Sequence, residues 1–484
     1  MSERNAQRLR IGTVSPVGIV FMVVATAAPL TAMATALPLV VGLGNGVGAP
    51  GSYLLVALVL ALFAVGYAAM SAHMTNAGAF YAYVTAGLGR PFGMAAGLVA
   101  VLAYNVLTLY VVGLVGFFAH QTFVDELGVD LPWWLYGGVG LGTALVLGIR
   151  GLELNVRVLG FLLIVETSLL MIFNVATLAR SGTAVLPPEA FSPSHVFSGS
   201  PGIALLFAVT CFIGFEATAI FGEEARDPRR TIPRATYLAI AFVGTLYVLT
   251  SWLIVGTNGG TNAGAVAAKD PGVYTFDALS AGLGGWSDNV VPWLLLTSLL
   301  AVLISLHNMS SRYLMAFGRD RVLPSALARI HARFKTPYVA GYVQATATAL
   351  VAAVYALAGA DPYLNLGSQT AGVGTLAVIV LMAACSFSVP FYFNRRGELR
   401  LWQHLIAPVA AGLALAFFAF LVVANYSLVS GSTSTLVNWL PALIPIVAAI
   451  GFVIGLRRTE QTPLDALERF EVLEEPLPAP PMAV

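Results

Sequence analysis

The sequence predicts an all-α membrane protein with twelve transmembrane helices. Hydrophobic residues make up 58% of its 484 residues and charged residues only 10%, and the mean hydropathy is +0.84. A soluble protein carries about 25% charged residues, so this chain has too little charge to cover a surface that faces water. These values exclude a soluble multidomain enzyme. A net charge of +1 also argues against a nucleic-acid-binding protein, which needs a basic surface.

Twelve apolar runs follow one another along the chain. A helix crosses the hydrocarbon layer, about 30 Å thick, with about 20 apolar residues, because each residue rises about 1.5 Å. Continuous runs exclude a transmembrane β-barrel, whose strands are short and alternate in polarity. The runs are residues 17–42, 50–72, 92–119, 133–149, 158–179, 201–222, 235–256, 290–316, 338–358, 366–393, 403–425 and 436–456. Breakers between them include Pro91, Pro132, Pro201, Pro233, Pro337 and Pro441.

The basic residues support this count and orient the chain. With the N-terminus in the cytoplasm, 22 of the 24 Lys and Arg residues fall in inside segments, and only Arg180 and Lys269 fall outside. Adding or missing one span would scramble that split. Residues 25–27 resemble a signal-peptide cleavage site, but the apolar run continues to Val41, so we expect a retained first span. The chain is therefore predicted to lie in the cell membrane with both termini in the cytoplasm.

Two predicted spans contain a helix-breaking sequence. Pro29 lies within residues 26–31 of span 1, and Gly214 lies within residues 211–216 of span 6. Proline removes a backbone donor and glycine frees the backbone. Lipid tolerates irregular backbone only where protein or a water-filled cavity pairs its polar groups, and transporters bind solutes at such segments. The two breaks lie five spans apart, as a five-plus-five inverted repeat requires. A simple kink in each helix is the alternative.

The domain division follows from these breaks. We expect one twelve-helix domain over residues 1–456, with repeats at about residues 17–179 and 201–393 and two extra helices at about residues 403–456. Residues 457–484 are expected to form a disordered cytoplasmic tail, because they are acidic and end in a proline-rich stretch.

Two of the 23 acidic residues lie deep inside predicted spans, Glu166 in span 5 and Glu216 in span 6. An ionised side chain at that depth costs about 2.5–3.5 kcal/mol on insertion scales. No Lys or Arg lies deep in any span to pair with either acid. Each glutamate is thus a candidate proton carrier or partner for a substrate amine. The alternative is a protonated glutamate that only bonds a neighbouring helix.

Other polar residues are weaker candidates. Tyr104 and Asn105 in span 3, and Ser305 and Asn308 in span 8, either line a pocket or bond between helices. The sequence contains no phosphate-binding loop, nucleophile elbow or metal-ligand cluster. Cys211 and Cys385 form no disulfide framework. We therefore expect no cofactor, no metal and no catalytic residue.

Two segments carry a more specific pattern. One reads Phe212-Ile-Gly-Phe-Glu216 followed by Glu223-Glu-Ala-Arg-Asp-Pro-Arg-Arg-Thr-Ile-Pro-Arg234. The other reads Ser311-Arg-Tyr-Leu-Met-Ala-Phe-Gly-Arg-Asp320 followed by Leu323-Pro324 and Thr336-Pro337. Together they resemble the signatures of the amino acid–polyamine–organocation (APC) superfamily of permeases.

The resemblance implies a LeuT-type fold with alternating access. Helices 1 and 6 are then unwound at the substrate site, with further contacts from helices 3, 8 and 10. Backbone groups of helix 1 hold the carboxylate of the substrate and those of helix 6 hold its amine. The corresponding residues are Ala27, Ala28, Pro29, Leu30 and Thr31, and Phe212, Ile213, Gly214, Phe215 and Glu216.

Two positions depart from the family pattern. Some proton-coupled relatives carry a lysine where helix 5 has Glu166, so an acid here replaces a base. Most relatives have Gly-Ser-Gly-Ile-Phe at the break in helix 1, whereas residues 27–32 of this chain contain no glycine. This difference leaves open a different amino acid geometry, or an amine without a carboxylate.

We expect a secondary transporter that imports an amino acid or related amine with a proton. Glu166 would load the proton, and Glu216 would couple the broken helix to the substrate or the gate. Sodium is the alternative coupling ion, with Ser305 as an oxygen ligand, and exchange is a further alternative. A nutrient sensor that binds without sustained transport is the alternative from another class. The predicted partners are the small-molecule substrate and the lipid bilayer, and not nucleic acid.

Overall fold

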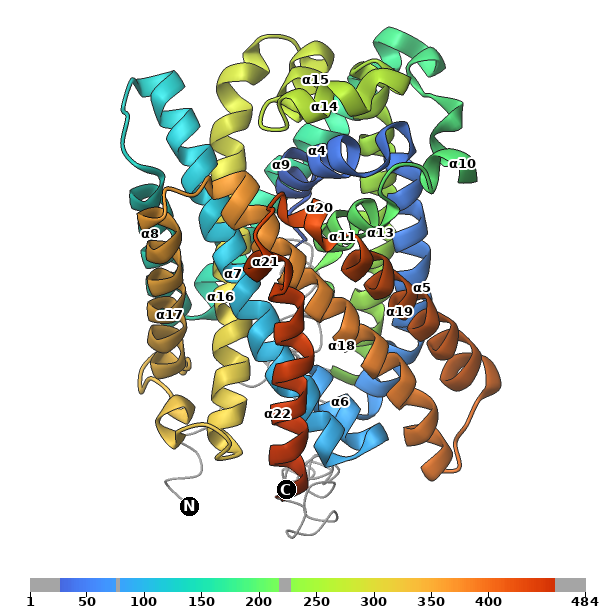
Figure 1. Cartoon of the computed structure of the whole chain (residues 1–484), viewed down its shortest axis with the longest axis vertical. Coiled ribbons are helices and arrows are strands. Elements are labelled where there is room, and N and C mark those ends of the chain that lie inside the picture. Colours follow the sequence, from blue (N-terminus) through green and yellow to red (C-terminus); the bar gives the residue numbers. More distant parts are fainter. Residues whose placement is uncertain (1–26, 75–78, 217–227, 458–484) are drawn as a thin grey trace, which may run out of the picture.

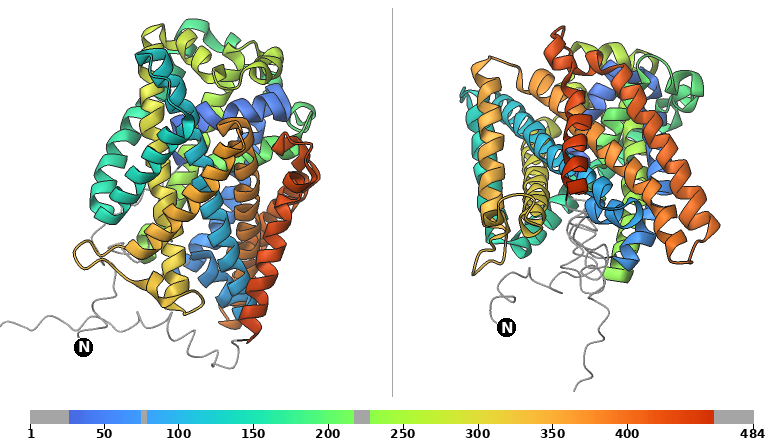
Figure 2. Two further views of the ribbon diagram at one scale, coloured as in Figure 1. Left: turned by 60° about the vertical axis from the view of Figure 1, so that its left-hand side comes forward. Right: turned by 60° about the horizontal axis from the view of Figure 1, so that its bottom comes forward.

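Long helices dominate the protein (Figure 1). The computed structural model describes residues 27–74, 79–216 and 228–457, and these contain helices and turns but no strand. The long helices run side by side in one bundle, and the short helices α14 (Ala263–Lys269) and α15 (Tyr274–Leu283) cover one end of it (Figures 1 and 2).

Nine segments of the described chain are long and apolar enough to cross a membrane, so this is a multi-pass membrane protein. The long helices in these nine segments are α5 (Ala49–His73), α7 (Arg90–Leu127), α9 (Leu152–Ser181), α13 (Pro228–Thr257), α16 (Trp286–Arg319), α17 (Tyr338–Leu357), α18 (Ser368–Arg395), α19 (Ala407–Ala424) and α22 (Leu443–Arg457). A further long helix, α8 (Trp133–Arg150), is not among the nine. The apolar helix α11 (Pro201–Phe212) is shorter.

Short helices connect or extend the long ones. They are α6 (Ala79–Leu88), η4 (Gly182–Val185), η5 (Pro188–Phe191), α10 (Pro193–Val196), η7 (Gly260–Asn262), η8 (Ser325–Ala328), η9 (Pro362–Gly367), η10 (Leu401–Ile406), α20 (Tyr426–Ser430), α21 (Thr435–Asn438) and η11 (Leu440–Ala442).

The first described helix is built from short pieces. They are α3 (Pro29–Thr31), η1 (Ala32–Ala36), α4 (Leu37–Leu39), η2 (Val40–Asn45) and η3 (Gly46–Gly48). The pieces η1 and η2 are π-helical, and π turns are rare and occur mostly as single turns inside α-helices. Pro38 disturbs the backbone bonding here, because proline has no N–H to donate. We call residues 29–45 the outer half of helix 1, where outer means the end of the bundle that α14 and α15 cover.

Pro233 is one predicted boundary that the structure corrects. It lies inside α13 and does not precede the helix. A proline costs one backbone bond and a steric clash, and this 30-residue helix continues through it. Other predicted features fall outside the described residues: the start of span 1 up to residue 26, the end of span 6 from residue 217, the loop to residue 227, and the tail from residue 458.

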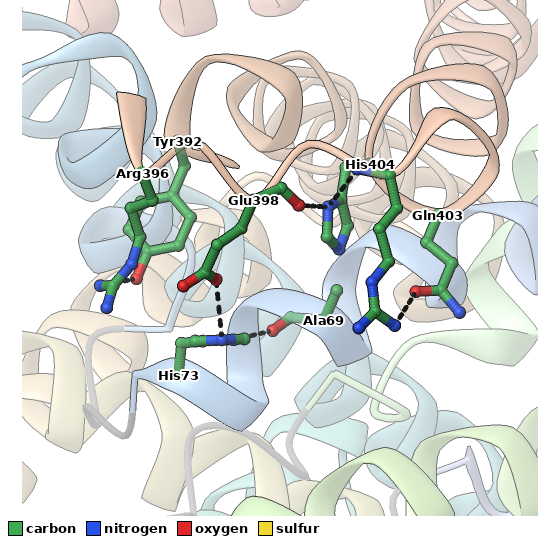
Figure 3. Close-up of polar contacts among 8 residues, drawn as sticks. Ala69, His73, Tyr392, Arg396, Glu398, Gln403 and His404 are labelled. Carbon is green, nitrogen blue, oxygen red and sulfur yellow. Dashed lines mark hydrogen bonds and ion pairs between the residues drawn. The ribbon is translucent and has the colours of Figure 1, made fainter. Parts of the chain in front are cut away.

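Polar contacts join elements at the end of the bundle opposite α15 (Figure 3). His73, in the last turn of α5, has Nδ1 2.9 Å from the carbonyl oxygen of Ala69 and Nε2 3.7 Å from the carboxylate of Glu398. The two side chains are 36% and 52% exposed, and an exposed ion pair contributes only about 0–1 kcal/mol. This end of the bundle is therefore held weakly at this contact.

Candidate functional site

The backbone leaves helical geometry at Ala28. Ala27 is helical, Ala28 is left-handed with φ 38° and ψ 79°, and α3 begins at Pro29. A left-handed residue other than glycine is strained, and Ala28 is fully buried. Proline suits the first position of a helix, where its missing N–H is not needed. The chain thus begins a new helix at a strained turn inside the protein.

A second departure from helical geometry follows α11, which ends at Phe212; we call this turn and the one at Ala28 the two interruptions. Residues 213–216 form a turn in which Gly214 has φ 118°, a conformation that glycine adopts without steric cost. The N–H of Gly214 donates to one carboxylate oxygen of Glu216 at 2.9 Å, and the hydroxyl of Tyr104 donates to the other at 2.9 Å. Glu216 is fully buried and caps this turn with its own side chain.

One tyrosine joins the two interruptions. The hydroxyl of Tyr247, on α13, lies 2.6 Å from the carbonyl oxygen of Ala27 and 3.1 Å from that of Cys211. A phenol has one proton to donate, so two carbonyl groups, one beside each interruption, share it. The amino-acid sequence does not single out Tyr247, because a tyrosine in an apolar run gives no sign of its partners.

Glu166 reaches the interruption at Ala28 from α9. Its carboxylate accepts hydrogen bonds from the hydroxyl of Ser298, on α16, and from the N–H of Leu30. The hydroxyl of Thr31 in turn donates to Ser298 Oγ at 2.9 Å. The side chain of Glu166 is buried. A buried carboxylate therefore connects three elements, α9, α16 and the outer half of helix 1.

A cavity of about 40 Å³ lies between the interruptions. That volume has room for about three water molecules, so the site must widen to admit an amino acid. Most of its wall is apolar, and the polar side chains in it are those of three threonines, Tyr110 and Cys211. It is lined by Ala27, Thr31, Ala32, Thr35, Ala36, Leu107, Tyr110, Val111, Thr210, Cys211, Ile213, Val302 and Leu306.

The structure brings some of the predicted site residues together at this cavity. Ala27, Thr31 and Ile213 line it, and Glu166 is linked to Thr31 through Ser298. Tyr104 bonds Glu216. The others that form the interruptions without lining the cavity are Ala28, Pro29, Leu30, Phe212, Gly214 and Phe215.

Three predicted site residues lie elsewhere. Asn105 donates to the carbonyl oxygen of Val101 in its own helix, at 2.7 Å. Ser305 is buried in α16 and is not among the residues that line the cavity. Asn308 lines a second cavity of about 10 Å³, next to His307. For these three, the arrangement described here shows no contact with the central cavity.

Several lining residues were missed in the sequence. Leu107, Tyr110 and Val111 share one face of α7, and Val302 and Leu306 share one face of α16. The spacing of each set is helical, but a membrane helix is apolar on every side. Sequence periodicity therefore does not distinguish a face that lines a cavity from one that meets lipid.

The model of the amino acid permease family matches residues 12–450 of the chain. The chain belongs to the amino acid permease family. This confirms the resemblance to the APC superfamily and identifies a transporter. The match covers the described residues that form both interruptions and the cavity between them.

The chain is also similar in sequence to individual permeases and other transporters. The chain is 25% identical to the branched-chain amino acid permease BcaP of Bacillus subtilis (strain 168), over 79% of this chain and 82% of that protein. It is 25% identical to BcaP of Lactococcus lactis subsp. cremoris (strain MG1363), over 85% and 81%. It is 24% identical to the methylthioribose transporter of Bacillus subtilis (strain 168), over 70% and 76%.

Proposed function

We propose that this permease imports an amino acid with an aliphatic side chain together with a proton. The observation that carries the proposal is the meeting of two interrupted helical segments at one mainly apolar cavity, beside a buried carboxylate. An apolar wall favours an aliphatic side chain over a charged one, because burying an unpaired charge is costly. The similarity to two branched-chain amino acid permeases supports the same class.

The architecture we propose is the LeuT-type fold of twelve transmembrane helices. In it, the first repeat ends with α9 and the second with α18, and α19 and α22 are the two extra helices. The two interruptions then stand at the first helix of each repeat, as inverted-repeat transporters require. Both termini face the cytoplasm, so α14 and α15 face outside. Alternating access opens the cavity to one side at a time.

The coupling role of Glu166 follows from competition for a backbone donor. The N–H of Leu30, in the first turn after the interruption, already donates to the carboxylate of Glu166. A substrate carboxylate at residues 27–31 needs the same kind of donor. A proton on Glu166 removes its charge and weakens its hold on Leu30, which frees this donor for the substrate. Proton loading and substrate binding then favour each other, as coupled transport requires.

The test is uptake by purified protein in liposomes. An inward proton gradient should drive accumulation of labelled leucine, isoleucine or valine above the level of protein-free liposomes, and a proton ionophore should abolish it. Charged amino acids serve as controls for side-chain class. Lack of accumulation of any aliphatic amino acid in sealed, protein-containing liposomes would contradict the proposal. Methylthioribose belongs in the same panel, because a similar protein carries that substrate in its name.

Two alternatives, sodium coupling and a sensor that does not transport, are each tested by a separate measurement in the same liposomes. Glu166, Ser298 and Thr31 place three oxygen-bearing side chains together, and oxygen ligands also suit sodium. A sodium gradient without a proton gradient tests that ion. Counterflow tests the sensor alternative, since labelled substrate enters against unlabelled internal substrate only if the protein turns over.

A further inference from the structure

Two hydroxyl groups hold the outer half of helix 1 from neighbouring elements. Thr275 of α15 donates to the carbonyl oxygen of Met33 at 2.7 Å. Tyr363 of η9 donates to the carbonyl oxygen of Thr35 at 2.6 Å. All four residues are buried. The two acceptors lie two residues apart in the chain and are reached from two separate parts of the protein.

The π-helical backbone explains why Met33 needs an outside donor. In η1, the N–H of Leu37 bonds the carbonyl oxygen of Ala32, five residues earlier. The next donor in this register would be residue 38, paired with Met33. Pro38 has no N–H. In the π register, the carbonyl group of Met33 has no backbone donor, and a buried carbonyl group without a hydrogen bond is costly. The hydroxyl of Thr275 supplies the missing donor.

A related argument applies to Thr35. In the π register, the carbonyl oxygen of Thr35 would accept from the N–H of Val40, but that N–H donates to the carbonyl oxygen of Leu37. Tyr363 is the first residue after Pro362 in η9, and its own N–H donates to the carboxylate of Asp361 at 2.8 Å. Asp361 thus caps the turn that carries Tyr363, and from this turn the hydroxyl of Tyr363 reaches the backbone of helix 1.

These contacts lie between the cavity and the end of the bundle covered by α15. Thr35 lines the cavity, and the chain continues from it through α4 to the region beneath α14 and α15 (Figure 1). The ring of Tyr363 packs against Phe117 and Phe118 of α7, with centroids 5.1 and 5.6 Å apart. On this side of the cavity, the two hydroxyl groups therefore tie the outer half of helix 1 to α15 and η9.

We propose that Tyr363 and Thr275 are positioning residues that form a latch, which closes the cavity toward the α15 end. The latch rests on the proposed function, because it regulates access to the cavity assigned there to the substrate. Each contact is a neutral hydrogen bond to a backbone carbonyl, so each makes a modest contribution. A latch of this strength keeps the closed state populated and still lets it open repeatedly.

The chain carries its own reporter for this latch. It has two cysteines, and one of them, Cys211, lines the cavity. The variant C385A leaves Cys211 as the single thiol. A membrane-impermeant methanethiosulfonate reagent, applied to sealed vesicles of each orientation, then measures how fast the cavity opens to each side.

In the C385A background, Y363F and T275V should each label about 2- to 10-fold faster from the α15 side, the ratio expected for one neutral hydrogen bond. Labelling from the opposite side should not increase. T275S keeps the hydroxyl and should label at the parent rate. Y426F is the matched control, because the buried hydroxyl of Tyr426 donates to the carbonyl oxygen of Gln369, at 3.1 Å, and not to helix 1.

Equal rates for the parent, Y363F and T275V would overturn the latch, and so would equal acceleration by T275S and T275V. Labelling of the SDS-denatured proteins checks that the thiol itself is unchanged, and size-exclusion chromatography checks folding. Protection of Cys211 by leucine tests the proposed function separately. Faster labelling without protection would support the latch and reject the substrate site.

Discussion

The interruption at residues 213–216 provides its own carboxylate, whereas the interruption at Ala28 receives one from another helix. In the first case, Glu216 caps the N–H of Gly214, two residues before it, and is bonded by Tyr104 from α7. In the second case, Glu166 comes from α9 and meets Leu30 and Ser298.

The difference separates local support from a connection between moving parts. A cap inside a turn stays with the turn when the turn moves. A carboxylate from a separate helix must release its donors when the two elements part, so its charge can control the motion. We therefore expect Glu166 to govern coupling and Glu216 to govern the shape of its turn. The coupling role that the sequence predicted for Glu216 is tested by the variants of Glu166 and Glu216 described below.

The largest effect is expected from E166Q. Glutamine keeps the size of the side chain and can still bond Leu30 and Ser298, but it is neutral and cannot bind or release a proton. Accumulation driven by a proton gradient should fall to the level of protein-free liposomes, while counterflow of labelled leucine continues. The partly exposed Glu189 of η5 provides the control E189Q, which should transport normally. Full proton-driven accumulation by E166Q would show that the charge of Glu166 is not needed.

The next effect is expected from E216A, and it concerns stability. Removing this side chain leaves the N–H of Gly214 and the hydroxyl of Tyr104 buried without their present partner, at a cost of about 1–3 kcal/mol for each group left unpaired. The midpoint of thermal unfolding in detergent should fall. E216Q should be close to the parent, because an amide can accept from Gly214 and donate to Tyr104. Loss of proton coupling in a stable E216Q protein would reverse the assignment of the two acids.

A smaller effect is expected from S298A. This variant removes the hydroxyl between Thr31 and Glu166 and leaves the bond from Leu30 in place. A bond to a charged group contributes about 1.5–3 kcal/mol, and the remaining donor offsets part of that loss. Proton-driven uptake should fall several-fold more than counterflow does. Equal decreases in both assays would mean that Ser298 supports only packing.

The smallest effect is expected from Y247F, because Tyr247 contacts a carbonyl group beside each interruption and neither carboxylate. The variant leaves the carbonyl groups of Ala27 and Cys211 without this donor and should cost about 1 kcal/mol of stability. Since the hydroxyl of Tyr247 bonds backbone carbonyl groups and not Glu166, the ratio of proton-driven uptake to counterflow should stay at the parent value. A change in that ratio would show that Tyr247 takes part in coupling.

The sequence predicted much of the fold, but it did not predict which site residues contact one another. The interruptions were predicted because Pro29 and Gly214 act on their own backbone. Ser298 could not be found as the partner of Thr31, nor Tyr363 as the partner of Thr35, because the paired residues are 267 and 328 positions apart. Pro38 lacks the N–H that the carbonyl group of Met33 would meet in the π register, but nothing near it in the chain indicates that Thr275 bonds that carbonyl group.

The amino-acid sequence alone determined that this is a multi-pass helical membrane protein with two interruption-prone segments and two deeply placed acids. Lipid excludes charge and unpaired backbone, so these features act through composition and near neighbours in the chain. Only the tertiary structure decided which hydroxyl groups meet which carbonyl and carboxylate groups, and which apolar faces surround the cavity. Those contacts depend on how each helix is rotated against the others, and an almost uniformly apolar helix surface does not encode that rotation in any local pattern.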